Sequence, residues 1–197
     1  PTWNLGAKWN IDRETFMRPF RNVSKLAVRL SYGLTAKMNE EAVNASAVYQ
    51  SGIVQRHRLG DRENKIDIRH LENRDLTWEK MYEWNLGLEL GLWNNRVSAT
   101  VDLYRRNSYD LIDRILTSGV GGQYYKYANF GDLRTVGAEI GVSTLNIKTE
   151  RFSWSTTLTL SAMDQKVTRL LNTPTALDMV AGRGRGNVVG FPRGSLF

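Results

Sequence analysis

The sequence predicts an all-β fold: a section of an antiparallel transmembrane β-barrel with short turns at one rim and long loops at the other. Three observations lead to this prediction. Apolar and polar residues alternate along several segments, the connections between those segments differ sharply in length, and aromatic residues stand at the ends of the apolar runs. No stretch approaches the roughly 20 apolar residues of a membrane helix. The mean hydropathy of −0.42 fits a barrel, because strands with one polar face average to a polar sequence.

The clearest hairpin lies in the middle of the chain. Asn94-Asn95 predicts its tight turn, since Asn tolerates the positive φ that hairpin turns require. The return strand, 97–103, repeats the alternation of the first. That first strand places glycine and polar residues on one face and six large apolar residues on the other: Tyr82, Trp84, Leu86, Leu88, Leu90 and Leu92.

Other segments repeat the pattern with less regularity. A second hairpin is predicted from 136–142 and 152–160, with its turn near 148–150. Strands are also expected at 3–11 and 26–30, and a weaker one at 43–54. Long polar connections are expected at 55–77, 108–123 and 170–197. Short turns alternating with long loops are typical of outer-membrane barrels.

The length of the central strand fits a lipid-facing role. Tyr82 to Leu92 measures roughly 33 Å at about 3.3 Å per residue, and a tilt of ~45° reduces this to ~23 Å, close to the ~25 Å apolar band of a barrel. Tyr82 and Trp84 at one end and Trp154 at the opposite rim would form aromatic girdles. Arg105 has the lipid-facing parity, so it must snorkel or follow a bulge. On pattern alone, a soluble or surface β-sandwich that binds carbohydrate remains the alternative.

Several ordered motifs resemble SusC/RagA-type TonB-dependent transporters. LENRDLTWEK (71–80), followed by YEWNLGLE (82–89), is similar to the family's NPxLxWEK strand entry, with Arg74 in place of the usual Pro. Further matches along almost the whole chain follow in family order: SYGLT (31–35), GLWNNRV (91–97), VGAEI (136–140), FSWST (152–156) and GFPRGSLF (190–197).

The resemblance implies a role in nutrient uptake at the bacterial outer membrane. Residues 1–197 would be part of the barrel domain, about seven or eight strands of a barrel of about 22, with periplasmic turns and extracellular loops. The plug and N-terminal domains would lie outside the chain. Family members import oligosaccharides, glycans or peptides. The implied partners are a SusD-like surface lipoprotein, the lipid bilayer, and TonB, which would act through a plug and TonB box absent from this chain.

The sequence offers no catalytic or metal-binding constellation, so we expect neither an enzyme nor a cofactor. His57 and His70 both fall in a polar segment expected to be a loop. The formal charge is +7, but the Lys and Arg residues are scattered along the chain rather than gathered in one patch. We therefore expect no nucleic-acid partner. Sugar rings stack on aromatic faces, so the candidate ligand contacts are aromatic: Tyr124, Tyr125, Tyr127 and Phe130. A second interfacial girdle is the favoured explanation of the same residues.

Overall fold

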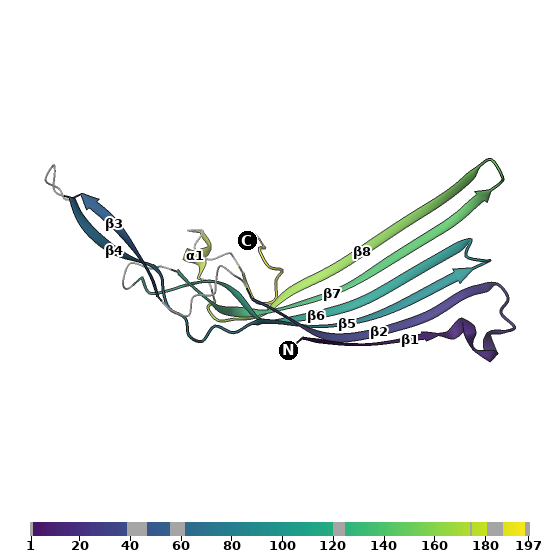
Figure 1. Cartoon of the computed structure of the whole chain (residues 1–197), viewed down its shortest axis with the longest axis horizontal. Helices are drawn as coiled ribbons and strands as arrows, with labels where there is room; N and C mark the ends of the chain where they lie inside the picture. Colours follow the sequence, from purple (N-terminus) through teal and green to yellow (C-terminus); the bar gives the residue numbers. More distant parts are fainter. Residues whose placement is uncertain are drawn as a thin grey trace. The chain divides into compact units, whose positions relative to one another are not determined.

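The computed structural model describes residues 2–38, 47–55, 62–119, 125–173, 175–180 and 187–195. These residues form an all-β structure, as predicted (Figure 1). Two 3₁₀ turns, η1 (Ile11–Arg13) and η2 (Thr15–Met17), and the short helix α1 (Ala176–Val180) accompany the strands. The strands are β1 (Trp3–Asn10), β2 (Val23–Lys37), β3 (Val48–Gln55), β4 (Arg62–His70), β5 (Glu79–Leu92), β6 (Val97–Leu116), β7 (Tyr125–Lys148) and β8 (Ser153–Leu170).

Six strands form one sheet in the order β1-β2-β5-β6-β7-β8. The order follows the chain except that the β3–β4 hairpin is inserted between β2 and β5. β1 and β2 pair antiparallel, with Trp3 opposite Leu34 and Lys8 opposite Arg29. The sheet is therefore a meander, the arrangement in which each strand of a barrel wall pairs with its neighbour in sequence. None of the described helices is long and apolar enough to cross a membrane.

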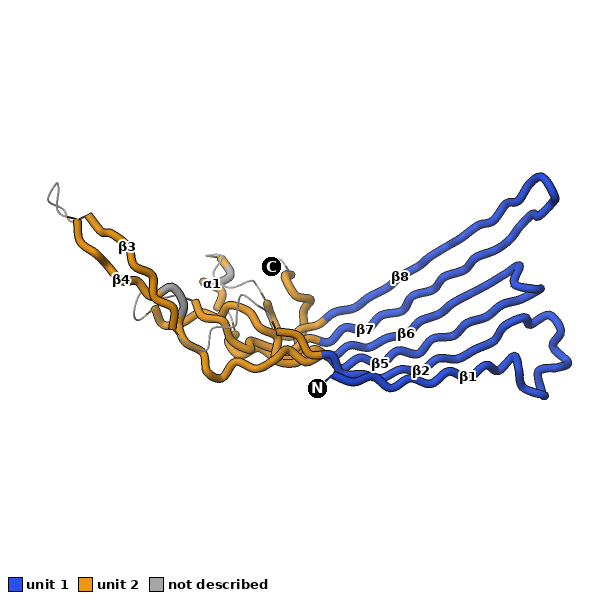
Figure 2. Tube along the Cα trace, in the orientation of Figure 1, with its two compact units in different colours: residues 1–35, 81–107, 134–165 blue, residues 36–80, 108–133, 166–197 orange. Residues whose placement is uncertain are grey.

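The chain divides into two compact units (Figure 2). Unit 1 comprises residues 1–35, 81–107 and 134–165, and holds the connections 11–22, 93–96 and 149–152. Unit 2 comprises residues 36–80, 108–133 and 166–197, and holds the β3–β4 hairpin and the connections 71–78 and 117–124. The connections 93–96 and 149–152 are the short turns that the sequence predicts, whereas 11–22, also in unit 1, has 12 residues and contains η1 and η2.

The sheet of unit 1 has two different faces. The polar face carries Lys8, Arg29, Glu89 and Asp102 and the residues that alternate in step with them. The apolar face carries the opposite parity, including the leucines of β5. Leu88 on the apolar face is 38% exposed, whereas the side chain of Glu89 is only 14% exposed. A single-layer sheet has no second layer to cover its apolar side, so large apolar side chains stay exposed there.

The predicted turn at Asn94-Asn95 is confirmed, and the structure shows that Trp93 belongs to it as well. Asn94 and Asn95 both have positive φ, 54° and 59°, as a type I′ hairpin turn requires. Trp93 also has a positive φ of 50°, and its carbonyl accepts a hydrogen bond from the backbone N–H of Arg96 at 3.2 Å. Trp93 therefore belongs to the turn rather than to a face of β5.

Three expectations about connections were wrong. β4 lies within the segment 55–77, which we expected to be a loop, and pairs with β3 so that Ser51 faces Ile66. β6 continues to Leu116 although a loop was expected from Ser108. A positive φ of 56° at Asp110 interrupts the alternation of apolar and polar residues. A search for period-two alternation therefore does not detect this part of the strand. β8 likewise includes Leu170. The weak strand expected at 43–54 is observed from Val48, and residues 43–46 lie outside the described part of the chain.

Candidate functional site

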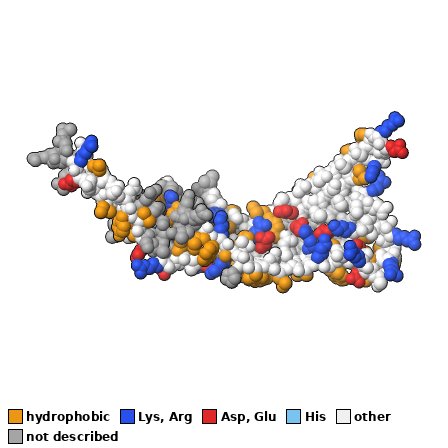
Figure 3. Space-filling model, viewed as in Figure 1, with side chains coloured by type: hydrophobic (Ala, Val, Ile, Leu, Met, Phe, Trp, Pro, Cys, Tyr) orange, Lys and Arg blue, Asp and Glu red, His pale blue; other side chains and the backbone are white. Residues whose placement is uncertain are grey.

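A cluster of five charged side chains lies on the polar face of unit 1. The carboxylate of Glu89 in β5 meets Lys8 Nζ of β1 at 3.1 Å, Lys25 Nζ of β2 at 2.7 Å and Arg29 Nε of β2 at 3.3 Å. Arg29 also contacts Asp102 of β6 at 2.9 Å. We call these residues the Glu89 cluster. It links four neighbouring strands, and Figure 3 shows charged side chains of both signs grouped over unit 1.

Strand periodicity explains how the Glu89 cluster forms. Successive side chains point to opposite faces of a strand, and the β1–β2 register places Lys8 beside Arg29 on the polar face. Sequence reasoning assigned Glu89 and Asp102 to the polar face but missed the cationic residues around them. The alternation of β1 and β2 contains the necessary signal, but only the register shows which residues meet.

A second ion pair on the polar face includes an aromatic ring. Arg106 Nε donates to Glu83 Oε2 at 2.7 Å, and the guanidinium carbon of Arg106 lies 4.5 Å from the ring centroid of Tyr104. Gly137 of β7 makes room for that ring, because a Cβ at this position would clash with Tyr104. The polar face therefore presents carboxylate, guanidinium and aromatic groups in fixed positions.

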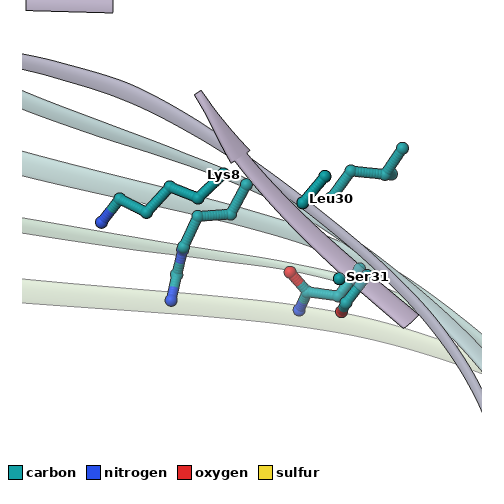
Figure 4. A pocket seen from close by; sticks show the side chains of 7 residues that line it. Lys8, Leu30 and Ser31 are labelled. Atoms are coloured by element: carbon teal, nitrogen blue, oxygen red, sulfur yellow. The ribbon is translucent and has the colours of Figure 1, made fainter. Parts of the chain in front are cut away.

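A hollow of about 300 Å³ lies beside the Glu89 cluster (Figure 4). Part of its lining carries hydrogen-bonding groups, from Lys8, Arg29, Ser31 and Asn85. Gly6 of β1, which is opposite Ser31, adds no side chain to fill the hollow. Such a surface can contact hydroxyl, amide or carboxylate groups of a ligand. Its openness suits transient contacts rather than tight enclosure, since sites for tightly held small molecules are usually deep and concave.

Unit 2 contains a second network, formed by Lys80, Asp110, Asp132 and Arg169 and called the Asp110 network below. Arg169 Nε contacts Asp132 Oδ2 at 2.7 Å, and Lys80 Nζ contacts Asp110 Oδ2 at 3.2 Å. Asp132 Oδ1 accepts the backbone N–H of Asp110 at 3.1 Å. The network thus holds a non-glycine residue in the left-handed region, a conformation that persists only where its surroundings determine it.

The Asp110 network also sets the ionisation of Asp132. This residue precedes Val136, where the apolar alternation of β7 begins, so it lies outside the apolar band. Burial acts to raise its pKa, but the hydrogen bonds from Arg169 and from the backbone of Asp110 outweigh burial. The pKa of Asp132 therefore lies below its ordinary value.

The predicted aromatic ligand contacts have different environments. Tyr124 lies outside the described residues, and Tyr125 at the start of β7 is exposed. The hydroxyl of Tyr127 accepts from Arg114 Nε at 3.2 Å, and the Arg114 guanidinium lies 5.4 Å from the ring centroid of Tyr127. Phe130 is buried, with the guanidinium of Arg193 5.6 Å from its ring centroid. A ligand role for these aromatics remains a prediction.

Six of the residues predicted to face lipid share one side of β5, and Trp154 lies in β8. Aromatic residues of β1 and β2 continue the row that Tyr82 begins. Tyr82 stacks on Tyr32 of β2 at 6.4 Å between ring centroids, and Tyr32 meets the edge of Trp3 at 5.4 Å. Trp84, Leu86, Leu88 and Trp154 are exposed, while Leu90 and Leu92 are half-buried. The sequence reading of the girdle missed Tyr32, which only the strand order places beside Tyr82. Contact with lipid remains a prediction.

Within the described residues, no group of three His, Cys, Asp or Glu side chains is arranged to hold a metal ion. His57 lies outside the described part of the chain.

Comparison with known proteins identifies the architecture. A family model described as "TonB dependent receptor-like, beta-barrel" matches residues 1–192. TonB-dependent receptor P39 of Formosa agariphila is 28% identical over 170 residues, which cover 86% of this chain and 16% of that protein. TonB-dependent receptor SusC of Bacteroides thetaiotaomicron is 25% identical over 170 residues, covering 85% of this chain and 17% of SusC.

Solved structures share the fold. The RagAB peptide importer in its closed-closed state superimposes with a TM-score of 0.77 at 23% identity, over 90% of this chain and 19% of the matched chain. The RagAB peptide transporter gives a TM-score of 0.75 at 24% identity, over 86% and 18%. The present chain spans less than a fifth of the length of these relatives. The match over nearly all of its residues, together with the two-faced meander, shows that the chain belongs to the TonB-dependent receptor β-barrel family of the outer membrane.

Proposed function

We propose that this chain is a section of barrel wall in a TonB-dependent importer of oligosaccharides, glycans or peptides. The observation that carries the proposal is the two-faced sheet of unit 1 in a member of this barrel family. Its apolar face would contact the bilayer, and its polar face would line the lumen. Residues 1–197 would then form part of the barrel domain, with the plug and N-terminal domains elsewhere in the intact protein.

The distribution of charge supports this orientation. Every ion pair of unit 1 described above lies on the polar face, where water in a lumen would solvate it. The same carboxylates and ammonium groups facing hydrocarbon would each cost several kcal/mol. In contrast, Leu86 and Leu88 are exposed on the opposite face. Lipid is the environment in which that exposure costs least.

The proposed import requires partners that the sequence resemblance implies. A SusD-like surface lipoprotein would retain the ligand outside the lumen, and TonB would supply energy through a plug and TonB box located outside residues 1–197. RagAB, which has the same fold, is a peptide importer. SusC is a TonB-dependent receptor of similar sequence. The likeness to RagAB supports peptides as substrates, and the sequence resemblance described above supports oligosaccharides and glycans.

A carbohydrate-binding β-sandwich is not favoured. In a sandwich the apolar face of one sheet packs on a second sheet. The described strands outside the main sheet are only β3 and β4, which pair with each other. The family match independently supports a barrel. We propose no catalytic role.

Deletion of the encoding gene tests the import proposal. Uptake of labelled oligosaccharides and labelled peptides should be measured in the deletion strain, in a strain complemented with the intact gene, and in the complemented strain after collapse of the proton gradient. Uptake of at least one class should fall on deletion, return on complementation and depend on energy. Unchanged uptake of both classes, or recovery of the intact protein in the soluble fraction, would contradict the proposal.

A further inference from the structure

An apolar groove lies in unit 1 and has a volume of about 480 Å³. Trp84 and Leu103 form part of its lining. Ala138 and Ala162, which also line it, have small side chains and so leave a depression between larger residues such as Trp84 and Leu103. Six of the nine lining residues have the apolar-face parity: Trp84, Leu103, Val136, Ala138, Ala162 and Asp164. The groove is therefore a hollow in the face proposed to contact lipid, in a region where neighbouring strands carry bulkier leucines.

Two arginines lie on the apolar face next to this groove. Arg105 follows the lining residue Leu103 by two positions in β6, and Arg134 precedes the lining residue Val136 by two positions in β7. Period-two alternation therefore gives each arginine the same parity as its groove neighbour. Both belong to the end of the unit 1 strands that is remote from the turns 93–96 and 149–152.

These arginines differ from those on the polar face in their partners. Arg29 and Arg106 each form an ion pair with a carboxylate. Among the described residues, Arg105 makes one weak contact, from its Nε to Asn107 Oδ1 at 3.4 Å, and Arg134 is exposed without a carboxylate partner. Two guanidinium groups that form no ion pair with a described carboxylate thus lie at the end of the groove, where its lining also includes Asp164.

The combination fits one kind of occupant. A guanidinium group binds phosphate through two parallel hydrogen bonds, and it does so more strongly where water is scarce. An acyl chain in the groove would cover its apolar lining, while a phosphate joined to that chain would reach the two arginines. A free phosphate ion would leave the groove empty, and a neutral lipid would leave both arginines without a counterion.

We propose that the groove and the pair Arg105–Arg134 bind one anionic, phosphate-bearing membrane lipid. The acyl chain lies against Ala138 and Ala162, and the headgroup phosphate accepts hydrogen bonds from the two guanidinium groups. This site rests on the proposed function in one respect, because it requires the apolar face to contact the bilayer.

Trp84 provides a reporter inside the groove. The intact protein should be reconstituted in phosphatidylcholine vesicles that contain a small, equal mole fraction of brominated phosphatidylglycerol or of brominated phosphatidylcholine. The quenching due to Trp84 is the difference between wild type and Trp84→Phe. Binding of the anionic lipid predicts several-fold more Trp84 quenching by the phosphatidylglycerol probe. Removal of each arginine should reduce this preference by roughly fivefold, the effect of about 1 kcal/mol for each basic residue near a membrane surface.

The variants Arg105→Gln and Arg134→Gln separate the headgroup from the groove. They should remove the preference for phosphatidylglycerol while leaving quenching by the brominated phosphatidylcholine probe unchanged. Arg151→Gln, in the turn at the opposite end of unit 1, is the matched control and should keep the preference. Equal quenching by both probes in wild type would overturn the lipid site but leave the proposed lipid-facing orientation intact. Absence of Trp84 quenching by either probe would overturn both.

Discussion

Different kinds of side-chain contact stabilise the backbone in unit 1 and in unit 2. In unit 1 the strands keep strict alternation, and the ion pairs join side chains across neighbouring strands on one face. In unit 2 the alternation breaks at Asp110, and carboxylates bond to backbone groups: Asp132 to the N–H of Asp110 and Glu79 to the N–H of Ile112, at 2.8 Å. In the proposed orientation, lipid on one face and water on the other enforce period two. Where that contrast ends, irregular backbone is allowed but must be held by side chains.

The strongest test of the contrast places a charge on each face of unit 1. Leu88→Arg puts a guanidinium into the proposed lipid region and should lower the free energy of unfolding by about 2–4 kcal/mol. Thr100→Arg, on the polar face, should change it far less, because a wet lumen solvates the charge. Denaturant unfolding of the intact protein in lipid vesicles measures both. Similar losses for the two variants would contradict the assignment of faces.

The next largest effect should arise in unit 2. Asp132→Ala removes the partner of Arg169 and the acceptor for the Asp110 N–H, at a cost of about 1–3 kcal/mol. Because Asp110 holds a positive φ, the backbone nearby should open. Hydrogen exchange should therefore accelerate at Asp110 and not at residues 86–92 of β5. A uniform acceleration in both places would show that Asp132 stabilises the sheet as a whole.

The sequence predicted the strands of unit 1 better than those of unit 2. β5, the turn at Asn94-Asn95 and the β7–β8 hairpin were predicted, because large apolar residues recur at every second position there. β4 was missed, since only Ile66 and Ile68 mark one face of a two-stranded hairpin. The end of β6 was missed because the alternation breaks at Asp110, which has a positive φ, and the adjacent residues Ile112 and Asp113 are both buried.

The candidate site was less predictable than the fold. Parity alone assigns Glu89 to the polar face, but pairing it with Lys8 requires the registers of β1, β2 and β5, which sequence periodicity does not give. The aromatics proposed as ligand contacts were chosen for the chemistry of their rings, because sugar rings stack on aromatic faces. The sequence did not indicate that Phe130 is buried, with the guanidinium of Arg193 5.6 Å from its ring centroid.

A smaller effect is expected from the Glu89 cluster. Glu89→Gln removes the carboxylate shared by Lys8, Lys25 and Arg29, whose side chains are 42%, 50% and 45% exposed. Solvent screens such pairs, so the loss of stability should be no more than about 1 kcal/mol and should shrink further at high salt. Unfolding of wild type and Glu89→Gln at low and high ionic strength measures this. A loss that does not depend on salt would show that packing, not charge, explains the effect.

The smallest expected effect is the response of the Asp110 network to acid. The folded-state pKa of Asp132 lies below its ordinary value, so the stability that its charge contributes is present above the ordinary pKa of 3.8 and is lost as pH falls through the lower folded value. Protection of the Asp110 amide, corrected for intrinsic exchange, should therefore stay constant from neutral pH to about pH 5 and decline below pH 3.8. Asp132→Asn cannot titrate and should show lower but pH-independent protection. If wild type and Asp132→Asn declined in parallel, another group would control the acid response, and the carboxylate of Asp132 would have only a hydrogen-bonding role.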